Sequence, residues 1–442
     1  MKLPKVGFIP IQFIQEDKAA TELSEKACSK LKDTQKLDVL KANPVFTAQQ
    51  ARNAVRRCFA EDVDVVIYFI SCWIDSSVVI SAVQEVGMPY IVWGCSDLNT
   101  QSLLGAVEAV TSLKNLEEKF KAVYGDPGDE KTVEEIVTRA KAARVLKKLR
   151  RAKIGFIGGI TFGMYDAVHD LVALREKLGV DVVHLDQYRI IEEMDRIPES
   201  DVEAAISKAS NRVGRVEAGK EHMVKSFKIY LALKRLIEKF EFDAIMIKCH
   251  PDLSQIYGAC GCIGASLLID DDLPCACEGN LYTAVTMLIL HELTGSPPFC
   301  HEISAVDTEG STMLLWHCGA GAPSLAKNPS EVTLKQQYAA PVEKGGQMGG
   351  VTLDFWVKAG NATIAILGGV CENIKMQISQ GEILEPRKMD LGAGKIWARA
   401  LIKVPDAEKF IKETLGHQFV TVHGEVEKEL TDLCDLANIP TV

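Results

Sequence analysis

Short apolar runs alternate with stretches of helical periodicity along the first part of the chain. Apolar, β-branched runs at residues 5–9, 63–72 and 89–95 predict buried strands, and residues 18–31 predict a helix. Strands that alternate with helices are joined by right-handed crossovers into parallel sheets. The first segment is therefore predicted to be an α/β domain.

The same pattern starts again near residue 153, after a charged stretch with eight basic residues between positions 139 and 153. An apolar stripe within that stretch indicates a helix packed on one side, which marks a domain boundary. Beyond it, strands are predicted at residues 154–157, 180–185 and 244–249, and a helix at 165–178. The glycine-rich turn at 158–163 fits no nucleotide-binding motif, but it follows a strand, where open α/β sheets bind ligands.

After residue 295 the helical periodicity gives way to hairpin signals. The pattern predicts two β-hairpins, each with a short polar turn. One joins strands at residues 302–306 and 312–316, and the other joins strands at 352–357 and 363–367. A final helix is predicted at 425–436. The fold class is thus two parallel-sheet α/β domains, at 1–152 and 153–295, followed by a mainly antiparallel β domain, sheet or barrel, at 296–442.

Charge, apolar runs and cysteine content exclude several classes of function. The 442 residues carry a formal net charge of -10, which argues against nucleic-acid binding. No apolar run reaches the roughly 18 residues of a membrane span, and the N-terminus lacks a leader, so we expect a cytoplasmic protein that binds neither membrane nor nucleic acid. The cysteine count is odd, at 13. We interpret most of these thiols as small buried hydrophobes rather than disulfides or metal ligands.

The sharpest chemical signal lies between residues 263 and 295. The pattern predicts a strand that starts at residue 263, a turn with Glu278 and Gly279, and an apolar helix at 281–293. A carboxylate at such a junction either caps the helix or serves a site. Glu302 is a second carboxylate where the β domain begins, and the pair could hold Mn²⁺ or Mg²⁺ with a histidine. The candidate histidines are His301, His317, His417 and His423.

Four segments together resemble the L-fucose isomerase-like family, which is related to L-arabinose isomerases. They begin with Ala-Cys-Glu-Gly-Asn at 276–280 and Phe-Cys-His-Glu at 299–302. Leu-Trp-His-Cys-Gly follows at 315–319, and Gly-His-Gln-Phe-Val-Thr-Val-His-Gly-Glu at 416–425. The resemblance spans nearly the whole chain, and it implies two α/β domains with a β-rich C-terminal domain, in agreement with the pattern above.

The resemblance also implies the site. One Mn²⁺-like ion would be bound by Glu278, by Glu302 where the family has Asp, and by His417, with His423 as the fallback ligand and Gln418 where a second His is usual. The substrate-binding residues that it implies are Trp73, which can reach a neighbouring subunit in such oligomers, and Lys248 or His250 near the end of the strand before Glu278. Trp316 and His317 are further candidates for contact with the substrate. A homo-oligomer, trimer or hexamer, is expected.

The implied activity is isomerisation of a free aldose, fucose-like or arabinose-like, to a ketose through an enediol. Glu278 and Glu302 would ligate the metal and move the proton. Two other classes stay open: a sugar-binding or regulatory protein of the same fold that has lost catalysis, which Glu302 and Gln418 permit, and a metal-dependent lyase on a sugar phosphate. The sequence shows no phosphate clamp for the lyase.

Overall fold

The computed structural model describes residues 2–15, 17–337, 349–370, 373–386 and 397–442. Two compact units make up the chain: Met1–Lys148 with Lys428–Ala437, and Leu149–Glu427 with Asn438–Val442. The last helix therefore belongs to the same unit as the first domain. The three-domain division at residues 152 and 295 stays a prediction.

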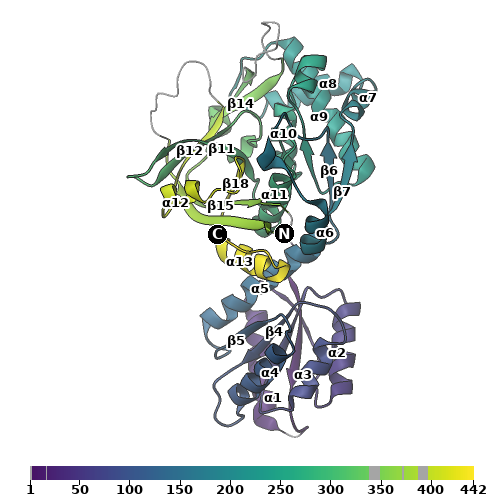
Figure 1. The fold of residues 1–442 in the computed structure, drawn as a ribbon, viewed down its shortest axis with the longest axis vertical. Helices are drawn as coiled ribbons and strands as arrows, with labels where there is room; N and C mark the ends of the chain where they lie inside the picture. Colours follow the sequence, from purple (N-terminus) through teal and green to yellow (C-terminus); the bar gives the residue numbers. More distant parts are fainter. Residues whose placement is uncertain (1, 16, 338–348, 371–372, 387–396) are drawn as a thin grey trace. The chain divides into compact units, whose positions relative to one another are not determined.

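The first unit is built on a five-stranded parallel sheet in the order β2-β1-β3-β4-β5 (Figure 1). Its strands are β1 Lys5–Ile11, β2 Asp38–Lys41, β3 Val65–Ile70, β4 Tyr90–Gly94 and β5 Lys121–Tyr124. Its helices are α1 Lys18–Asp33, α2 Ala48–Ala60, α3 Ser76–Val83, α4 Ser102–Asn115, α5 Glu130–Leu149 and α13 Glu427–Ala437. The predicted α/β fold of this segment is confirmed.

Alternating side chains of the strands fill two cores in this unit, one on each face of the sheet. In β3, Val66 and Tyr68 pack in one core, and Ile67 and Phe69 in the other. Such strands read as continuous apolar runs because both faces are buried. The basic stretch also contributes to a core, because the Arg139 guanidinium is only 2% exposed and is paired with Asp435 of α13 at 2.7 Å.

The second unit contains a four-stranded parallel sheet in the order β10-β9-β6-β7. Its strands are β6 Lys153–Ile157, β7 Asp181–Leu185, β9 Ala244–Ile247 and β10 Cys275–Ala276. Its helices are α6 Leu171–Leu178, α7 Tyr188–Met194, α8 Glu199–Ser210, α9 Lys220–Phe240, α10 Cys262–Asp270 and α11 Leu281–Thr294, with a 3₁₀ turn at Tyr165–Ala167 and a π-helical turn at Leu253–Tyr257.

Two predictions in this unit are wrong in detail. The segment from residue 263 is helix α10 rather than a strand, because a short run that is buried on every side has no periodicity to distinguish the two. The predicted helix at 165–178 is broken, because Asp170 caps the N-terminus of α6 by accepting a hydrogen bond from the Ala173 amide at 2.9 Å.

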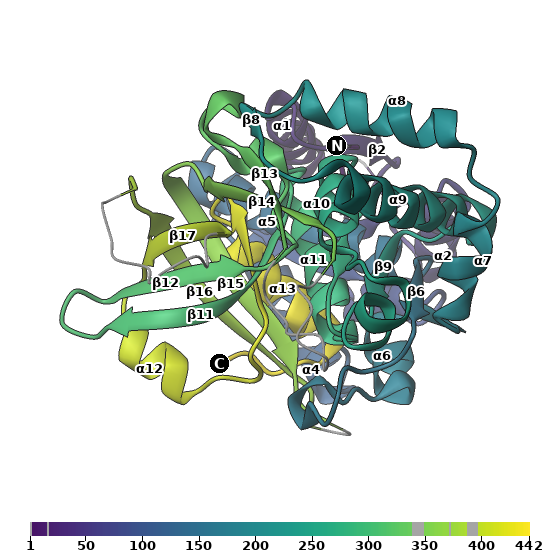
Figure 2. The same ribbon diagram turned by 90° about the horizontal axis from the view of Figure 1, so that it is seen from above.

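The same unit holds a nine-stranded sheet in the order β12-β11-β18-β15-β16-β17-β14-β13-β8 (Figure 2). Since β12 also pairs with β17, the first six strands close into an antiparallel barrel. The barrel strands are β11 Phe299–Asp307, β12 Thr312–His317, β15 Gly360–Gly368, β16 Lys375–Ile383, β17 Ala398–Lys403 and β18 Phe419–His423. Three further strands extend this sheet beyond β17: β14 Val351–Trp356, β13 Thr333–Gln336 and β8 Arg215–Val216. The region also contains the short helix α12 Ala407–Lys412 and 3₁₀ turns at Pro323–Leu325 and Pro329–Glu331.

The predicted fold class is confirmed: parallel α/β sheets are followed by a mostly antiparallel β region. The hairpin β11–β12 pairs as expected. The second predicted hairpin is wrong, because β14 pairs with β13 and β17 whereas β15 pairs with β16 and β18. A polar turn bends the chain there without making its two flanking strands partners. In the part of the chain that is described, no helix is long and apolar enough to cross a bilayer.

Candidate active site

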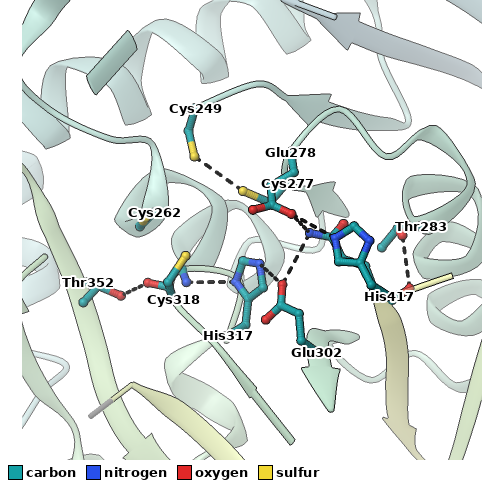
Figure 3. A network of polar contacts seen from close by, with 12 residues as sticks. Cys249, Cys262, Cys277, Glu278, Thr283, Glu302, His317, Cys318, Thr352 and His417 are labelled. Atoms are coloured by element: carbon teal, nitrogen blue, oxygen red, sulfur yellow. Dashed lines mark hydrogen bonds and ion pairs between the residues drawn. The ribbon is translucent and has the colours of Figure 1, made fainter. Parts of the chain in front are cut away.

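Loops at the carboxyl ends of three parallel strands meet the barrel within the second unit. Residues 158–166 follow β6, residues 248–250 follow β9, and residues 277–279 follow β10. The carboxyl end of a parallel sheet is where open α/β folds bind their ligands. Figure 3 shows the side chains of Glu278, Glu302, His317 and His417 turned toward one another at this place.

Glu278 lies in a tight left-handed turn after β10. Glu278 has φ +58° and Gly279 has φ +80°, and the amide of Thr161 donates to the Glu278 carbonyl at 3.0 Å. A Cβ on Gly279 would lie 2.2 Å from the Gly159 carbonyl oxygen, so only glycine fits this close approach. The N-cap of α11 is Asn280, whose side chain accepts from the Thr283 amide at 3.2 Å. Glu278 is therefore not the helix cap, and its carboxylate is free to serve the site.

Glu302 lies beside Gln418 because of the strand register. β11 and β18 are antiparallel and pair His301 with Phe419, so Glu302 and Gln418 are the next residues along. The Gln418 side-chain amide donates to Glu278 at 2.8 Å and lies 3.5 Å from a carboxylate oxygen of Glu302. One fully buried amide group thus holds the two carboxylates side by side.

His417 connects Glu278 to a residue that the sequence did not indicate. Its Nε2 lies 3.1 Å from a carboxylate oxygen of Glu278. Its Nδ1 and its backbone amide both contact the Oδ2 atom of Asp166, the backbone amide at 3.0 Å. Asp166 lies in the 3₁₀ turn after β6. In the sequence pattern it falls at the start of the predicted helix at 165–178, just after the turn at 158–163 that follows a strand.

His317 completes the group from the end of β12. It is 1% exposed, its Nδ1 accepts from the Gly319 amide at 2.9 Å, and its Nε2 lies 3.4 Å from Glu302. The structure therefore brings together four residues that the sequence proposed for the site: Glu278, Glu302, His317 and His417.

The environments of the two carboxylates shift their pKa values in opposite directions. Burial raises the pKa of Glu302. Burial acts in the same direction on Glu278, but the hydrogen bond from His417 and the charges of His317 and His417 outweigh it and lower the pKa of Glu278. A pair of neighbouring carboxylates that differ in this way is typical of acid–base catalysis, with one ionised and one able to hold a proton.

The two imidazoles gain affinity for protons from these carboxylates. Burial alone would lower the pKa of His417, but hydrogen bonds to Glu278 and Asp166 raise it to about 9. Burial likewise opposes protonation of His317, but the charge of Glu302 raises its pKa to about 10. Because the Nδ1 atom of His317 accepts from the Gly319 amide, the hydrogen of its ring lies on Nε2, which faces Glu302.

A cavity of about 620 Å³ opens beside these groups. Asp166, Glu302 and His417 supply polar side chains to its wall, and Ile303 and Phe419 supply apolar ones. Small-molecule sites are concave and of this order of size, with a few polar groups that converge on the ligand. The cavity therefore offers room for a small substrate beside Glu302 and His417, whereas Glu278 does not line it.

Buried thiols lie behind the site. The sulfur of Cys277, the residue before Glu278, lies 3.5 Å from that of Cys249 (Figure 3). Cys262 packs with Cys260 and Cys318. The cysteines of this group, Cys249, Cys260, Cys262, Cys277 and Cys318, are free thiols. This clustering is a tertiary feature that the C-x-C spacings did not indicate.

The other predicted site residues lie in different settings. Lys248 forms an ion pair with Asp252 at 2.6 Å, and the His250 imidazole contacts the Ser254 hydroxyl at 3.2 Å. The charge of His250 also contributes to the lowered pKa of Glu278, which places His250 near the carboxylate. Trp316 is opposite Glu302 in the hairpin and packs on Trp397.

Two candidate histidines are engaged elsewhere. The Nε2 of His423, at the far end of β18, contacts the Lys358 carbonyl at 2.9 Å, and six residues of extended chain separate it from His417 by roughly 20 Å. The buried His301 is bonded to the Thr421 hydroxyl at 2.8 Å. In the first unit, the Trp73 ring is 40% exposed and packs on Phe13.

The donor atoms at the site fit a hard divalent ion in kind. Glu278 and Glu302 supply carboxylate oxygens, and Asp166 holds the far nitrogen of His417, as carboxylates commonly do for metal-binding imidazoles. As the side chains stand, no group of three or more His, Cys, Asp or Glu among the described residues is arranged to hold a metal. His417 and Gln418 both contact the Glu278 oxygen that such an ion would use.

Comparison with known proteins gives relatives over most of the chain. No family model matches. A sulfoquinovose isomerase from Priestia megaterium (strain ATCC 12872 / QMB1551) is 26% identical over 386 residues, which cover 86% of this chain and 85% of that protein. A sulfoquinovose isomerase from Alkalicoccus urumqiensis is 25% identical over 396 residues, which cover 87% of this chain and 88% of that one. Both relatives are sugar isomerases by name, which supports the predicted enzyme class; neither is named as L-fucose isomerase-like.

Among solved structures, an ABC transporter solute-binding protein from Burkholderia multivorans is similar to 66% of this chain and to 93% of its own. Its identity is 13% and its TM-score is 0.19. A likeness of this degree supports no inference about function.

Proposed function

We propose that the protein is a metal-dependent aldose–ketose isomerase that acts on a free sugar through an enediol. The observation that carries this proposal is the placement of two carboxylates, Glu278 and Glu302, on one buried amide of Gln418 at 2.8 and 3.5 Å. Glu302 also lines the cavity of about 620 Å³. The similarity to sulfoquinovose isomerases over most of the chain supports the same enzyme class.

The two carboxylates would divide the proton transfers between them. Glu278, ionised, takes the proton from C2 of the open-chain aldose, while Glu302 gives its proton to O1, and an enediol forms. Glu278 then returns its proton to C1 as Glu302 takes the proton from O2. The carbonyl has moved from C1 to C2, the ketose leaves, and both carboxylates have their starting protonation.

The neighbouring side chains set these roles. Gln418 donates to Glu278 and so favours its ionised form, and His417 does the same from its Nε2. His317, 3.4 Å from Glu302, keeps a proton available beside that carboxylate. A divalent ion of the Mn²⁺ type, held by Glu278, Glu302 and His417, would polarise the two substrate oxygens and acidify the C2 hydrogen when bound.

The substrate that we propose is an aldose with an anionic substituent. The relatives are named for sulfoquinovose, a hexose that carries a sulfonate. In this chain Lys248 and His250 bring cationic or protonatable groups to the loop after β9, one strand away from Glu278. We infer that these two residues bind the anionic end of the sugar. L-fucose and the arabinoses are the neutral alternatives.

We also propose a homo-oligomer, a trimer or a hexamer, and a cytoplasmic location. The Phe13 and Trp73 rings are 50% and 40% exposed on the first unit, as expected of side chains that contact a second copy. Trp316 is a further candidate for contact with the sugar, because it lies opposite Glu302 in the hairpin.

The test is conversion of an aldose panel by metal-stripped protein with and without Mn²⁺, with sulfoquinovose, D-glucose, L-fucose, D-arabinose and L-arabinose as substrates. We expect metal-dependent ketose formation, with sulfoquinovose preferred. Glu302→Gln should lower kcat by roughly 10²–10⁴-fold, the range for a general acid or base. Glu309→Gln is the matched control, because Glu309 is exposed in the turn of the same hairpin.

A wild-type rate in Glu302→Gln would remove the assigned role of Glu302. Absence of ketose from every sugar would remove the isomerase proposal. Sugar binding without turnover, measured by calorimetry on the same panel, would then identify a sugar-binding protein of this fold.

A further inference from the structure

Asp166 holds His417 at two points. Its Oδ2 atom accepts from the His417 backbone amide at 3.0 Å and also contacts the ring Nδ1. The first contact fixes the position of the His417 backbone, and the second fixes the rotation of its ring. A side chain that is held at both ends of its rotatable bonds has one orientation.

The contact with Asp166 also determines which ring nitrogen faces the carboxylates. A carboxylate accepts hydrogen bonds, so the Nδ1 atom that faces Asp166 carries its hydrogen. The opposite nitrogen, Nε2, points at Glu278 from 3.1 Å and, facing a carboxylate too, carries a hydrogen as the side chains stand. It must give up that hydrogen to bind an ion, and the contact with Asp166 then keeps the remaining hydrogen on Nδ1. Histidines that bind metals usually donate their other ring N–H to a carboxylate in this way, which fixes the tautomer and raises the basicity of the binding nitrogen.

The loop that carries Asp166 is also held by contacts that do not involve His417. In the same loop, Thr161 donates to the Glu278 carbonyl at 3.0 Å through its amide and to the His250 carbonyl at 3.1 Å through its hydroxyl. After the loop, the Asp170 amide donates to the Tyr282 hydroxyl of α11 at 3.0 Å. These contacts join the loop to the elements that carry Glu278.

We propose that Asp166 is a positioning residue that fixes the orientation and tautomer of His417, so that Nε2 is presented to a divalent ion shared with Glu278 and Glu302. The inference rests on the proposed function for the identity of the ion. It goes beyond that function by assigning a role to a residue outside the ligand set. The side chain of Asp166 contacts His417, so the role assigned to it is exerted through that residue.

The test is calorimetric titration of Mn²⁺ into metal-stripped protein, without sugar. Asp166→Ala removes both contacts and should weaken Mn²⁺ binding about 10- to 100-fold, the range for loss of such a partner. Asp166→Glu keeps the carboxylate and should recover part of the affinity. Asp195→Asn is the matched control, because Asp195 is an exposed carboxylate of the same unit, and it should bind as the wild type does.

A role through His417 makes a further demand. In the His417→Gln background, Asp166→Ala should cause no additional loss of affinity, because the imidazole that it positions is gone. A loss of similar size in both backgrounds would show a general structural effect and overturn the proposal. Melting temperatures of all variants check that they are folded.

The proposal would also be overturned if Asp166→Ala bound Mn²⁺ with an affinity within about threefold of the wild type. It would likewise be overturned if the wild type did not bind Mn²⁺. The proposed function is judged separately, by ketose formation. A wild type that binds Mn²⁺ through this arrangement but converts no aldose would end the isomerase proposal and leave the role of Asp166 intact.

Discussion

Replacement of Gly279 by alanine tests whether the turn after β10 positions Glu278. The added Cβ would lie 2.2 Å from the Gly159 carbonyl oxygen and 2.5 Å from the Ile160 Cα, both backbone atoms that have no rotamer by which to escape. To reach even 3.0 Å from the oxygen, the two turns must separate by about 0.8 Å. This separation acts directly on the 3.0 Å hydrogen bond between Thr161 and Glu278.

The expected effect on catalysis follows from this displacement. A shift of about 1 Å in a catalytic group costs on the order of 10²-fold in rate. We therefore expect kcat/KM for aldose isomerisation to fall about 10²-fold in Gly279→Ala. The left-handed φ of +80° adds a loss of unfolding free energy of about 1–2 kcal/mol for any residue with a Cβ.

Gly159→Ala separates these two effects. Gly159 has φ +87°, but a Cβ there meets no atom within 4 Å. This control should lose a similar unfolding free energy in urea denaturation and keep most of its activity. If Gly279→Ala is as active as Gly159→Ala, the turn does not position the carboxylate and the reasoning is refuted.

Two further predictions concern polar groups around the site. Gln418→Leu removes the amide that Glu278 and Glu302 share. Because a hydrogen bond to a charged group contributes about 1.5–3 kcal/mol, kcat should fall roughly 10- to 100-fold, and a decrease of less than threefold would contradict this. Burial lowers the pKa of His301 to about 3, so between that value and the ordinary 6.5 the unfolded chain binds a proton that the folded chain does not. The burial of neutral His301 therefore costs no stability above pH 6.5. As the pH falls below that value, the free energy of unfolding decreases, by about 2 kcal/mol at pH 5. Urea denaturation of wild type and His301→Gln at pH 7 and 5 should show a smaller decline in the variant, and equal declines would refute it.

The sequence was informative where a local pattern determines the structure. The buried strands of the first unit are confirmed as β1, β3 and β4, because runs buried on both faces have a strong apolar signal. The junction at Glu278 and the hairpin that carries Glu302 were located from turn residues alone. Of the four candidate histidines, the structure places His317 and His417 with these carboxylates, and the resemblance had selected His417 among them as the metal ligand.

The features that the sequence did not show depend on contacts between distant segments. Asp166 and His417 are 251 positions apart, and an aspartate near the start of a predicted helix carries no sign of its partner. Two pairings of the β region likewise depend on how strands associate in space. β12 pairs with β17 to close the barrel, and β14 pairs with β17 rather than with β15, the next strand in the chain. Asn280 could not be distinguished from Glu278 as the helix cap until the turn was seen.

The most direct test of the account is NMR detection of ketose formed from the aldose panel in D₂O, by wild type and by Glu278→Gln, each with Mn²⁺. We predict that the wild type forms the ketose with solvent deuterium at C1, because an enediol exchanges the transferred proton, and that Glu278→Gln forms essentially none. Equal conversion by the two proteins, or no ketose from any aldose with the wild type, would contradict the account.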